Sequence, residues 1–305
     1  MATFLGNSSR NRQAVLGTIF AALAAIGFSA KAILVKLAYA SPVDAVTLLA
    51  IRMAFSVPFF IVVAWWSSRN AHALPLARQD WFAVLALGLI GYYLSSLLDF
   101  SGLQYISAGL ERLILFLYPT LVVLLSAALF KRRIGRREIF ALVLSYAGIV
   151  LVFMQDVRTP QDGLVLGAAL VFASTLTYSI YLIGAGHTIA RIGAMRFTAY
   201  AMVVASMATF LQFALTHPAS ALALPSRVYE LGFTMAIVST VLPVFMLSSG
   251  IRLIGAGRTA LVGSIGPVAT ILMAHTLLGE ALSIQQIGGS ALVLVGVLLI
   301  SLQRK

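Results

Sequence analysis

An internal duplication is the feature of this sequence that most limits its possible folds. Residues 102–151 align without a gap with residues 250–299, so that each residue of the first copy is aligned with the one 148 positions later. The residues that recur are Gly102, Ile106, Ala108, Gly109, Leu113, Pro119 and Gly148, as Gly250, Ile254, Ala256, Gly257, Leu261, Pro267 and Gly296. The repeat predicts two halves with one shared fold, residues 1–155 and 163–305.

Both copies lie in sequence that is too apolar for a soluble domain. Hydrophobic residues make up 61% of the chain and charged residues 10%, against about 25% charged in typical soluble domains. Apolar runs of about 20 residues, enough to cross the hydrocarbon of a bilayer, fill nearly all of it. They predict ten helices, at 14–38, 44–66, 81–100, 107–130, 138–154, 163–185, 194–215, 229–250, 256–278 and 282–302.

Five spans in each half require the second half to be inverted relative to the first, an arrangement typical of secondary transporters. We therefore predict an all-α integral membrane protein, with ten transmembrane helices as two inverted five-helix repeats around a central cavity. The lipid bilayer is its first predicted partner, and both a monomer and a homodimer are compatible with the sequence.

Charge predicts the orientation. With the N-terminus inside, fifteen basic residues lie on the cytoplasmic side, whereas Lys36, Arg158 and Arg227 lie outside, as the positive-inside rule requires. The fifteen are Arg10, Arg12, Arg69, Arg78, Lys131, Arg132, Arg133, Arg136, Arg137, Arg191, Arg196, Arg252, Arg258, Arg304 and Lys305. This rule also accounts for the net charge of +12 without nucleic acid as a partner. We predict a multi-pass protein of a bacterial inner membrane, with both termini cytoplasmic.

Motifs for catalysis and for metal or cofactor binding are missing from the sequence. Cysteine is absent, the four histidines are isolated, and no P-loop follows a glycine-rich turn. We therefore predict no enzyme activity, no metal and no cofactor. A membrane-embedded enzyme or a channel remains a less favoured alternative.

Several segments carry a resemblance to a known family. YISAGLERLILFLYP, LIGAGRTALVGSIGP and LLGEALSIQQIGGSALVLVGVLLI, together with the five-plus-five repeat, resemble the EamA-type ten-helix exporters of the drug/metabolite transporter superfamily. Lys36 and Arg52 stand where that family has a first-helix lysine and a second-helix arginine. One departure is Lys131 and Arg132, where the second copy has Gly279 and Glu280.

The resemblance implies a central cavity lined by the first, third, fourth, sixth, eighth and ninth helices, with the fifth and tenth helices peripheral. It implies a small-molecule substrate such as an amino acid, a related metabolite or a drug-like cation. We predict a secondary transporter that exports small amphipathic metabolites by alternating access, amino acids including aromatic ones being the favoured cargo. Cationic drugs and nucleotide sugars are the alternatives.

A polar and aromatic stripe marks the candidate substrate site. Tyr92, Ser95 and Asp99 recur on one face of the third helix, and aromatic rings with hydroxyls suit a zwitterionic or aromatic solute. The predicted substrate-binding residues are Tyr92, Ser95, Ser96, Asp99, Tyr178, Tyr181, Ser239 and Thr240. Helix packing is the alternative role for the serines and Thr240.

Charged residues within the apolar runs are candidates for coupling, because a charge in hydrocarbon is costly. They are Lys31, Arg52, Asp99, Glu111 and Arg112, and ion pairs between helices are the alternative role. We interpret Arg112 as the partner that keeps Glu111 ionised. Asp99 is therefore the predicted proton carrier.

Prolines predict the hinges. Pro119 and Pro267 occupy matching positions in the fourth and ninth helices, and Pro243 lies in the eighth. A proline inside a helix removes a hydrogen-bond donor and kinks the helix. The three prolines are therefore hinge candidates for alternating access, with static bends as the alternative.

Reporter fusions test the predicted orientation. We expect an alkaline phosphatase fused within residues 131–137, or after Lys305, to be inactive because both sites lie in the cytoplasm, where that enzyme does not mature. Phosphatase activity at either position contradicts the ten-span arrangement.

Overall fold

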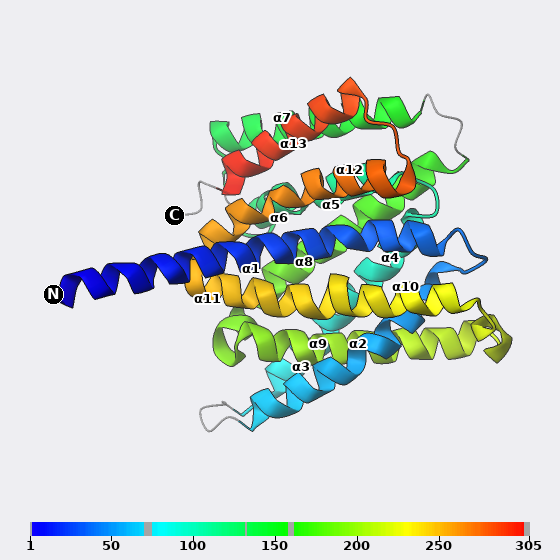
Figure 1. Cartoon of the computed structure of the whole chain (residues 1–305), viewed down its shortest axis with the longest axis horizontal. Coiled ribbons are helices and arrows are strands. Elements are labelled where there is room, and N and C mark those ends of the chain that lie inside the picture. Colours follow the sequence, from blue (N-terminus) through cyan, green and yellow to red (C-terminus); the bar gives the residue numbers. More distant parts are fainter. Residues whose placement is uncertain (1, 70–74, 132, 158–161, 302–305) are drawn as a thin grey trace.

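The helical character predicted from the apolar runs is confirmed in the computed structural model, which describes residues 2–69, 75–131, 133–157 and 162–301. Within these residues, nine helical segments are long and apolar enough to cross a membrane, and Ile284–Ile300 forms a shorter apolar helix. The helices run side by side, and the first part of α1 projects from one end of the bundle (Figure 1). We call this the N-terminal end. Arg132, Arg158, Arg304 and Lys305 lie outside the described residues.

Six of the predicted spans correspond to single helices, but the third, fourth, eighth and ninth are each built from more than one segment. In chain order the elements are α1 (Ala2–Ala38), α2 (Ala45–Ser68), α3 (Arg78–Gly88), the π-helical turn η1 (Leu89–Leu94), α4 (Ser95–Gly102), α5 (Ala108–Leu115), α6 (Tyr118–Leu129), α7 (Arg136–Asp156), α8 (Leu164–Ile192), α9 (Ala194–Thr216), the 3₁₀ turn η2 (Ala219–Leu222), α10 (Ser226–Ala236), the π-helical turn η3 (Ile237–Val241), α11 (Leu242–Gly263), α12 (Ile265–Leu278) and α13 (Ile284–Ser301). Gly255 has a positive φ of 81° inside α11 and marks the turn between the eighth and ninth spans.

Helix interruptions occur at equivalent places in the two halves. The π-helical turns begin at Leu89 and Ile237, 148 residues apart, and the breaks at Phe116 and Ser264 have the same spacing. Pro119 and Pro267 lie in the first turn after these breaks. The predicted interruptions are therefore present, whereas the π-helical turns, which often mark functional sites, were not predicted.

The loop between α1 and α2 is held by a side-chain cap. Asp44 accepts hydrogen bonds from the amides of Val46 and Thr47, at 2.8 and 3.1 Å, which satisfies donors that a helix start leaves free. Partial burial opposes ionisation of Asp44, but hydrogen bonds from Thr47 and Val46 and the nearby His217 hold the pKa of this carboxyl below its ordinary value. The cap therefore stays ionised at neutral pH.

The first helix of each half packs against the other half. α1 packs on α11 and α12, and α8 packs on α4, α5 and α6. A Cβ added at Gly17 of α1 would lie 2.5 Å from Ile254. A Cβ at Gly167 of α8 would lie 2.7 Å from Ile106, the residue equivalent to Ile254. The two halves are therefore interlocked through matched glycine contacts.

A separate helix pair, α7 with α13, lies along one side of the bundle (Figure 1). The helices touch at Gly148 and Gly289, where a Cβ on either residue would lie 2.5 Å from the carbonyl oxygen of the other. Small residues allow such backbone approach, and dispersion then stabilises helix association in lipid. The fifth and tenth helices are thus peripheral, as the resemblance implied.

The α7–α13 contact predicts an asymmetric response to glycine substitutions. We expect Gly148→Leu to destabilise the protein by about 1–3 kcal/mol, the usual cost of overpacking, because its side chain has no space beside Gly289. Thermal unfolding in detergent measures the change. The control is Gly186→Leu on α8, where an added Cβ meets no atom within 4 Å; equal destabilisation by the two variants contradicts the assigned contact.

Candidate functional site

Three charged side chains meet between α1, α4 and α5, at the end of the bundle opposite the N-terminal end. The Lys31 ammonium forms an ion pair with Asp99, and its Nζ lies 3.1 Å from Oε1 of Glu111. Asp99 is 3% exposed and Glu111 is completely buried. We call these three residues the charge cluster. In it, a single ammonium faces two carboxylates that are both removed from solvent.

The charge cluster changes the interpretation of Glu111. Its ion-pair partner is Lys31, and within the described part of the chain no carboxylate oxygen forms an ion pair with Arg112. Because Lys31 contacts both acids, Asp99 and Glu111 compete for the same positive charge. Arg112 also interacts electrostatically with both acids, so its predicted role in keeping Glu111 ionised stays a prediction, to which the structure adds the direct contact of Lys31 with both acids.

Arg112 lies where the fourth helix meets the break in the ninth. A Cβ added at Gly266 would lie 2.7 Å from Nη2 of Arg112, so the guanidinium lies directly against that backbone. Arg112 is half-buried, and its Nε has no hydrogen-bond partner within the described structure. Tyr118 and Tyr178, as well as both acids of the charge cluster, are close enough to interact with it electrostatically.

Arg52 is held by neutral groups. Its Nε donates to the Thr240 hydroxyl at 3.1 Å, and its guanidinium lies 5.3 Å from the centre of the Phe100 ring. The same hydroxyl donates to the Met235 carbonyl at 3.0 Å, which ties η3 to the last turn of α10. Thr240, predicted to bind substrate, therefore uses its hydroxyl to position Arg52 against the eighth span.

Four tyrosines from three elements form a continuous row, which we call the tyrosine row. Tyr118 meets Tyr178 edge to face at 5.8 Å, and Tyr178 stacks on Tyr181 at 5.5 Å between ring centres. Tyr92 meets Tyr181 at 5.0 Å, with their hydroxyls 3.1 Å apart. The structure thus brings the three predicted tyrosines together and adds Tyr118. Tyr181 is buried and packs on Gly91, whereas Tyr92, Tyr118 and Tyr178 are half-buried.

The predicted serines differ in their surroundings. Ser95 and Ser174 approach with their hydroxyls 3.0 Å apart, and Ser174 also donates to the Ser95 carbonyl at 2.8 Å. These bonds join α4 to α8, which is the packing alternative for Ser95. Ser96 is half-buried. Ser239 is buried in η3, and its hydroxyl has no hydrogen-bond partner within the described residues.

Serine hydroxyls also reach the backbone at both helix breaks. The Ser29 hydroxyl lies 2.8 Å from the Gly266 carbonyl and the Ser179 hydroxyl 3.3 Å from the Tyr118 carbonyl, and each shares its hydrogen with a carbonyl of its own helix at 2.7 Å. Gly266 and Tyr118 immediately precede Pro267 and Pro119, the prolines that recur in the two halves. A carbonyl at such a break needs a donor within the membrane. The recurrence of serine in the two first helices was the only sequence signal for these bonds.

Glu280 joins the two halves at the end opposite the N-terminal end. Its carboxylate accepts hydrogen bonds from the amides of Ala108 and Gly109, at 2.8 and 3.2 Å, and thereby caps α5 just before Glu111. Nδ1 of His275 lies 2.9 Å from the Glu280 carbonyl and donates to it. Sequence reasoning identified Glu280 only as part of a family pattern, because nothing in the sequence places it beside α5.

Two further features lie outside the charge cluster and the tyrosine row. Arg191, near the end of α8, forms an ion pair with the buried Asp80 at the start of α3. An apolar groove of about 450 Å³ lies between α3 and α9, and is lined by Arg78, Trp81, Phe82, Val84, Leu85 and Val204. No group of three potential metal ligands occurs within the described residues.

Comparisons with known proteins agree with this arrangement. The model of the EamA-like transporter family matches residues 15–154 and 165–302. The "Uncharacterized transporter YcbK" of Bacillus subtilis (strain 168) is 30% identical over 94% of both chains, and an "Uncharacterized transporter" of Archaeoglobus fulgidus is 24% identical over 91% of this chain and 95% of its own. A crystal structure that is 19% identical superposes with a TM-score of 0.66, covering 94% of this chain and 96% of the other; this likeness shows the fold.

The hydrogen bonds from α5 to the Glu280 carboxylate predict that removal of this group destabilises the protein. We expect Glu280→Ala to lower the free energy of unfolding by about 0.5–2 kcal/mol, the usual cost of losing a helix cap, because the Ala108 and Gly109 amides lose their acceptor. Thermal unfolding in detergent provides the measurement. Glu230→Ala is the control, since Glu230 pairs with Arg227 on an exposed surface; if both variants behave alike, the cap does not stabilise α5.

Proposed function

The chain belongs to the EamA-like transporter family, and from this membership we propose that it exports small amphipathic metabolites, amino acids in particular, by alternating access. The observation that carries this proposal is the meeting of the charge cluster and the tyrosine row around Arg112. Fixed charges suit the ends of a zwitterion, and aromatic rings suit its apolar body. Such a site transports its solute and need not change it chemically, so we propose a transporter and not an enzyme.

The tyrosine row supports a preference for aromatic and large apolar side chains. Tyr92, Tyr118 and Tyr178 are half-buried, so their rings retain surface for a solute. Aromatic pairs contribute about 0.5–1.5 kcal/mol beyond the burial of their area. Tyr181 is covered by Gly91 and Phe197, and we propose that it positions the neighbouring rings.

The paired helix breaks support alternating access. Each break lies beside a proline and is bridged by a serine of the opposite half, so a rotation of one half moves the break in the other. We propose that Pro119 and Pro267 act as symmetric hinges. We propose that Pro243, which follows the π-helical turn η3, extends this bending to the eighth span.

The charge cluster supports coupling to protons. Two buried carboxylates repel one another, and a proton on either removes that repulsion. Lys31 partly compensates this repulsion, so release and uptake of one proton change which acid holds the ammonium. Both acids have carboxylate oxygens that lack a donor within the described structure, and we propose Asp99 as the proton carrier because it is 3% exposed whereas Glu111, which shares Lys31, is completely buried.

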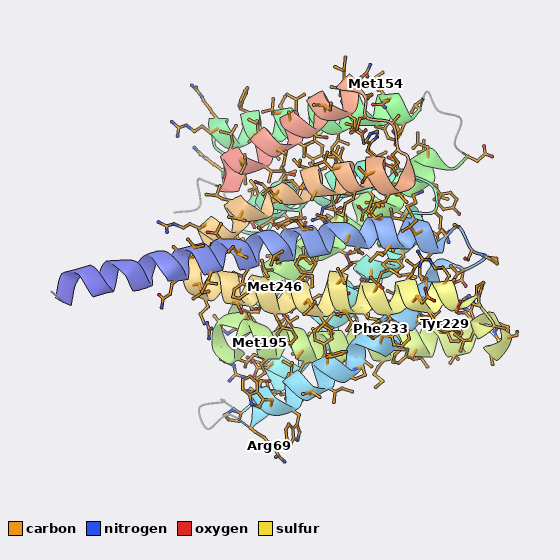
Figure 2. All side chains as sticks on the ribbon, in the orientation of Figure 1. Arg69, Met154, Met195, Tyr229, Phe233 and Met246 are labelled. Atoms are coloured by element: carbon orange, nitrogen blue, oxygen red, sulfur yellow. The ribbon has the colours of Figure 1, made fainter. Side chains whose placement is uncertain are left out.

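The orientation of the bundle fits a bacterial inner membrane with cytoplasmic termini, and we propose this location. Figure 2 shows Arg69 toward the N-terminal end and Tyr229 toward the opposite end. Arg69 is one of the fifteen residues assigned to the cytoplasm. The proposed outer end then carries the charge cluster, so protons reach it from outside the cell and exported solute leaves the protein at this end.

Proteoliposome transport tests cargo and coupling together. We expect phenylalanine and tyrosine to move faster than serine, a cationic dye or a nucleotide sugar, and transport to increase with an imposed pH gradient. Asp99→Asn should abolish the dependence on the gradient while retaining solute exchange, because the amide cannot carry a proton. Asp162→Asn, in an exposed loop, is the matched control and should behave as the unmodified protein.

The possible failures have different meanings. No movement of any amino acid excludes the proposed cargo. Transport by the unmodified protein that is independent of the pH gradient excludes proton coupling and leaves facilitated diffusion. Gradient dependence that survives in the Asp99 variant excludes Asp99 alone as the carrier.

A further inference from the structure

Arg112 lies near enough to both acids of the charge cluster to interact with them electrostatically, but it contacts neither of them directly. Lys31 contacts both buried acids, and Arg52 is engaged by Thr240 and Phe100. Arg112 forms no ion pair within the described part of the chain, and its Nε lacks an acceptor there. A guanidinium presents five donors in a rigid fork that matches a carboxylate, so this side chain has unused capacity for an anion.

The surroundings of Arg112 define which anion fits. The guanidinium lies against Gly266, where any Cβ would approach within 2.7 Å, and interacts electrostatically with Tyr118 and Tyr178. Those rings provide an apolar and aromatic wall, while the half-buried position of Arg112 leaves it open to a solute. A compact anionic group joined to an apolar or aromatic body matches this combination.

We propose that Arg112 binds the carboxylate of the transported solute, so that the cargo is a carboxylate with an apolar or aromatic side chain. This inference rests on the proposed transport function and makes its substrate class specific. Gly266 and Tyr118 immediately precede Pro267 and Pro119, and Arg112 lies close to both residues. A carboxylate held here contacts the two helix breaks together, which links solute binding to the elements proposed to move.

Three related solutes isolate the carboxylate. Phenylalanine has both a carboxylate and an amine, 3-phenylpropionate has only the carboxylate, and phenethylamine has only the amine. Binding to the purified full-length protein in detergent is measured for each solute by isothermal titration and by thermal stabilisation. We expect phenylalanine and 3-phenylpropionate to bind, and phenethylamine to bind at least tenfold more weakly than phenylalanine, because a charge-assisted bidentate contact is lost.

Substitutions of Arg112 test whether this side chain is the group that prefers a carboxylate. Arg112→Gln should weaken both carboxylates by about 10- to 100-fold, the range expected for hydrogen bonds to a charged group, and leave the affinity for phenethylamine unchanged or higher. Arg112→Lys keeps the charge without the fork and should lose less. Arg227→Gln, whose arginine is exposed at the bundle surface, is the matched control. Arg112→Lys also serves if Arg112→Gln fails to give a monodisperse protein.

The outcomes separate this inference from the proposed function. Equal binding of phenylalanine and phenethylamine by the unmodified protein overturns the carboxylate site, as does an equal loss of all three solutes in either Arg112 variant. Binding of no carboxylate, together with transport of a cationic dye in proteoliposomes, overturns the site but retains a transporter. Arg112-dependent binding of 3-phenylpropionate without amino acid transport supports the site and excludes amino acids as the cargo.

Discussion

The contact of one ammonium with two buried carboxylates is the constraint around which the rest of the bundle is arranged. Charges in hydrocarbon cost about 2.5–3.5 kcal/mol each on insertion scales, so Lys31, Asp99 and Glu111 are compatible with a membrane only when they are held together. Their contact requires α1, α4 and α5 to meet at one depth. Glu280 reinforces the arrangement from the other half by capping α5 one turn before Glu111.

The two halves share a backbone but divide the chemistry between them. When Ser29 is aligned with Ser179, Lys31 is equivalent to Tyr181. In the 148-residue repeat, Glu111 and Arg112 are equivalent to Thr259 and Ala260. The charge cluster is therefore built by the first half alone, whereas the second half has an aromatic or neutral residue at each equivalent position. The tyrosine row, in contrast, takes Tyr92 and Tyr118 from the first half and Tyr178 and Tyr181 from the second.

Sequence reasoning predicted the features that depend on local pattern. Apolar run length predicted the spans, and repeated prolines predicted the interruptions near Pro119 and Pro267. The periodicity of the third helix placed Tyr92 and Asp99 on one polar face. Lys131 shows how strongly the repeat controls the backbone, because it has a φ of 51° where its equivalent, Gly279, has 70°, although only glycine adopts such values without strain.

The contacts between helices could not be predicted from the sequence. The depth of a residue in the membrane and the helix face that carries it do not specify which residue of another helix it contacts. Arg112 follows Glu111 in sequence and is near enough to interact with it electrostatically, but adjacent residues on a helix point about 100° apart, and the direct contact with Glu111 is made by Lys31 from another helix. The same limit applies to Ser95 and Thr240, whose hydroxyls contact α8 and Arg52. The site roles of these residues remain predictions that the proposed experiments address.

The serine bonds at the two breaks have a consequence for how the chain reaches its folded state. Each serine hydroxyl shares its one hydrogen between a carbonyl of its own helix, at Ala25 or Thr175, and a carbonyl of the other half, at Gly266 or Tyr118. A half without its partner keeps the bond within the helix, but the carbonyl at its own break loses this donor, which is unfavourable in lipid. Docking of the second half therefore adds a polar contribution to the stability of the break that the first half already contains.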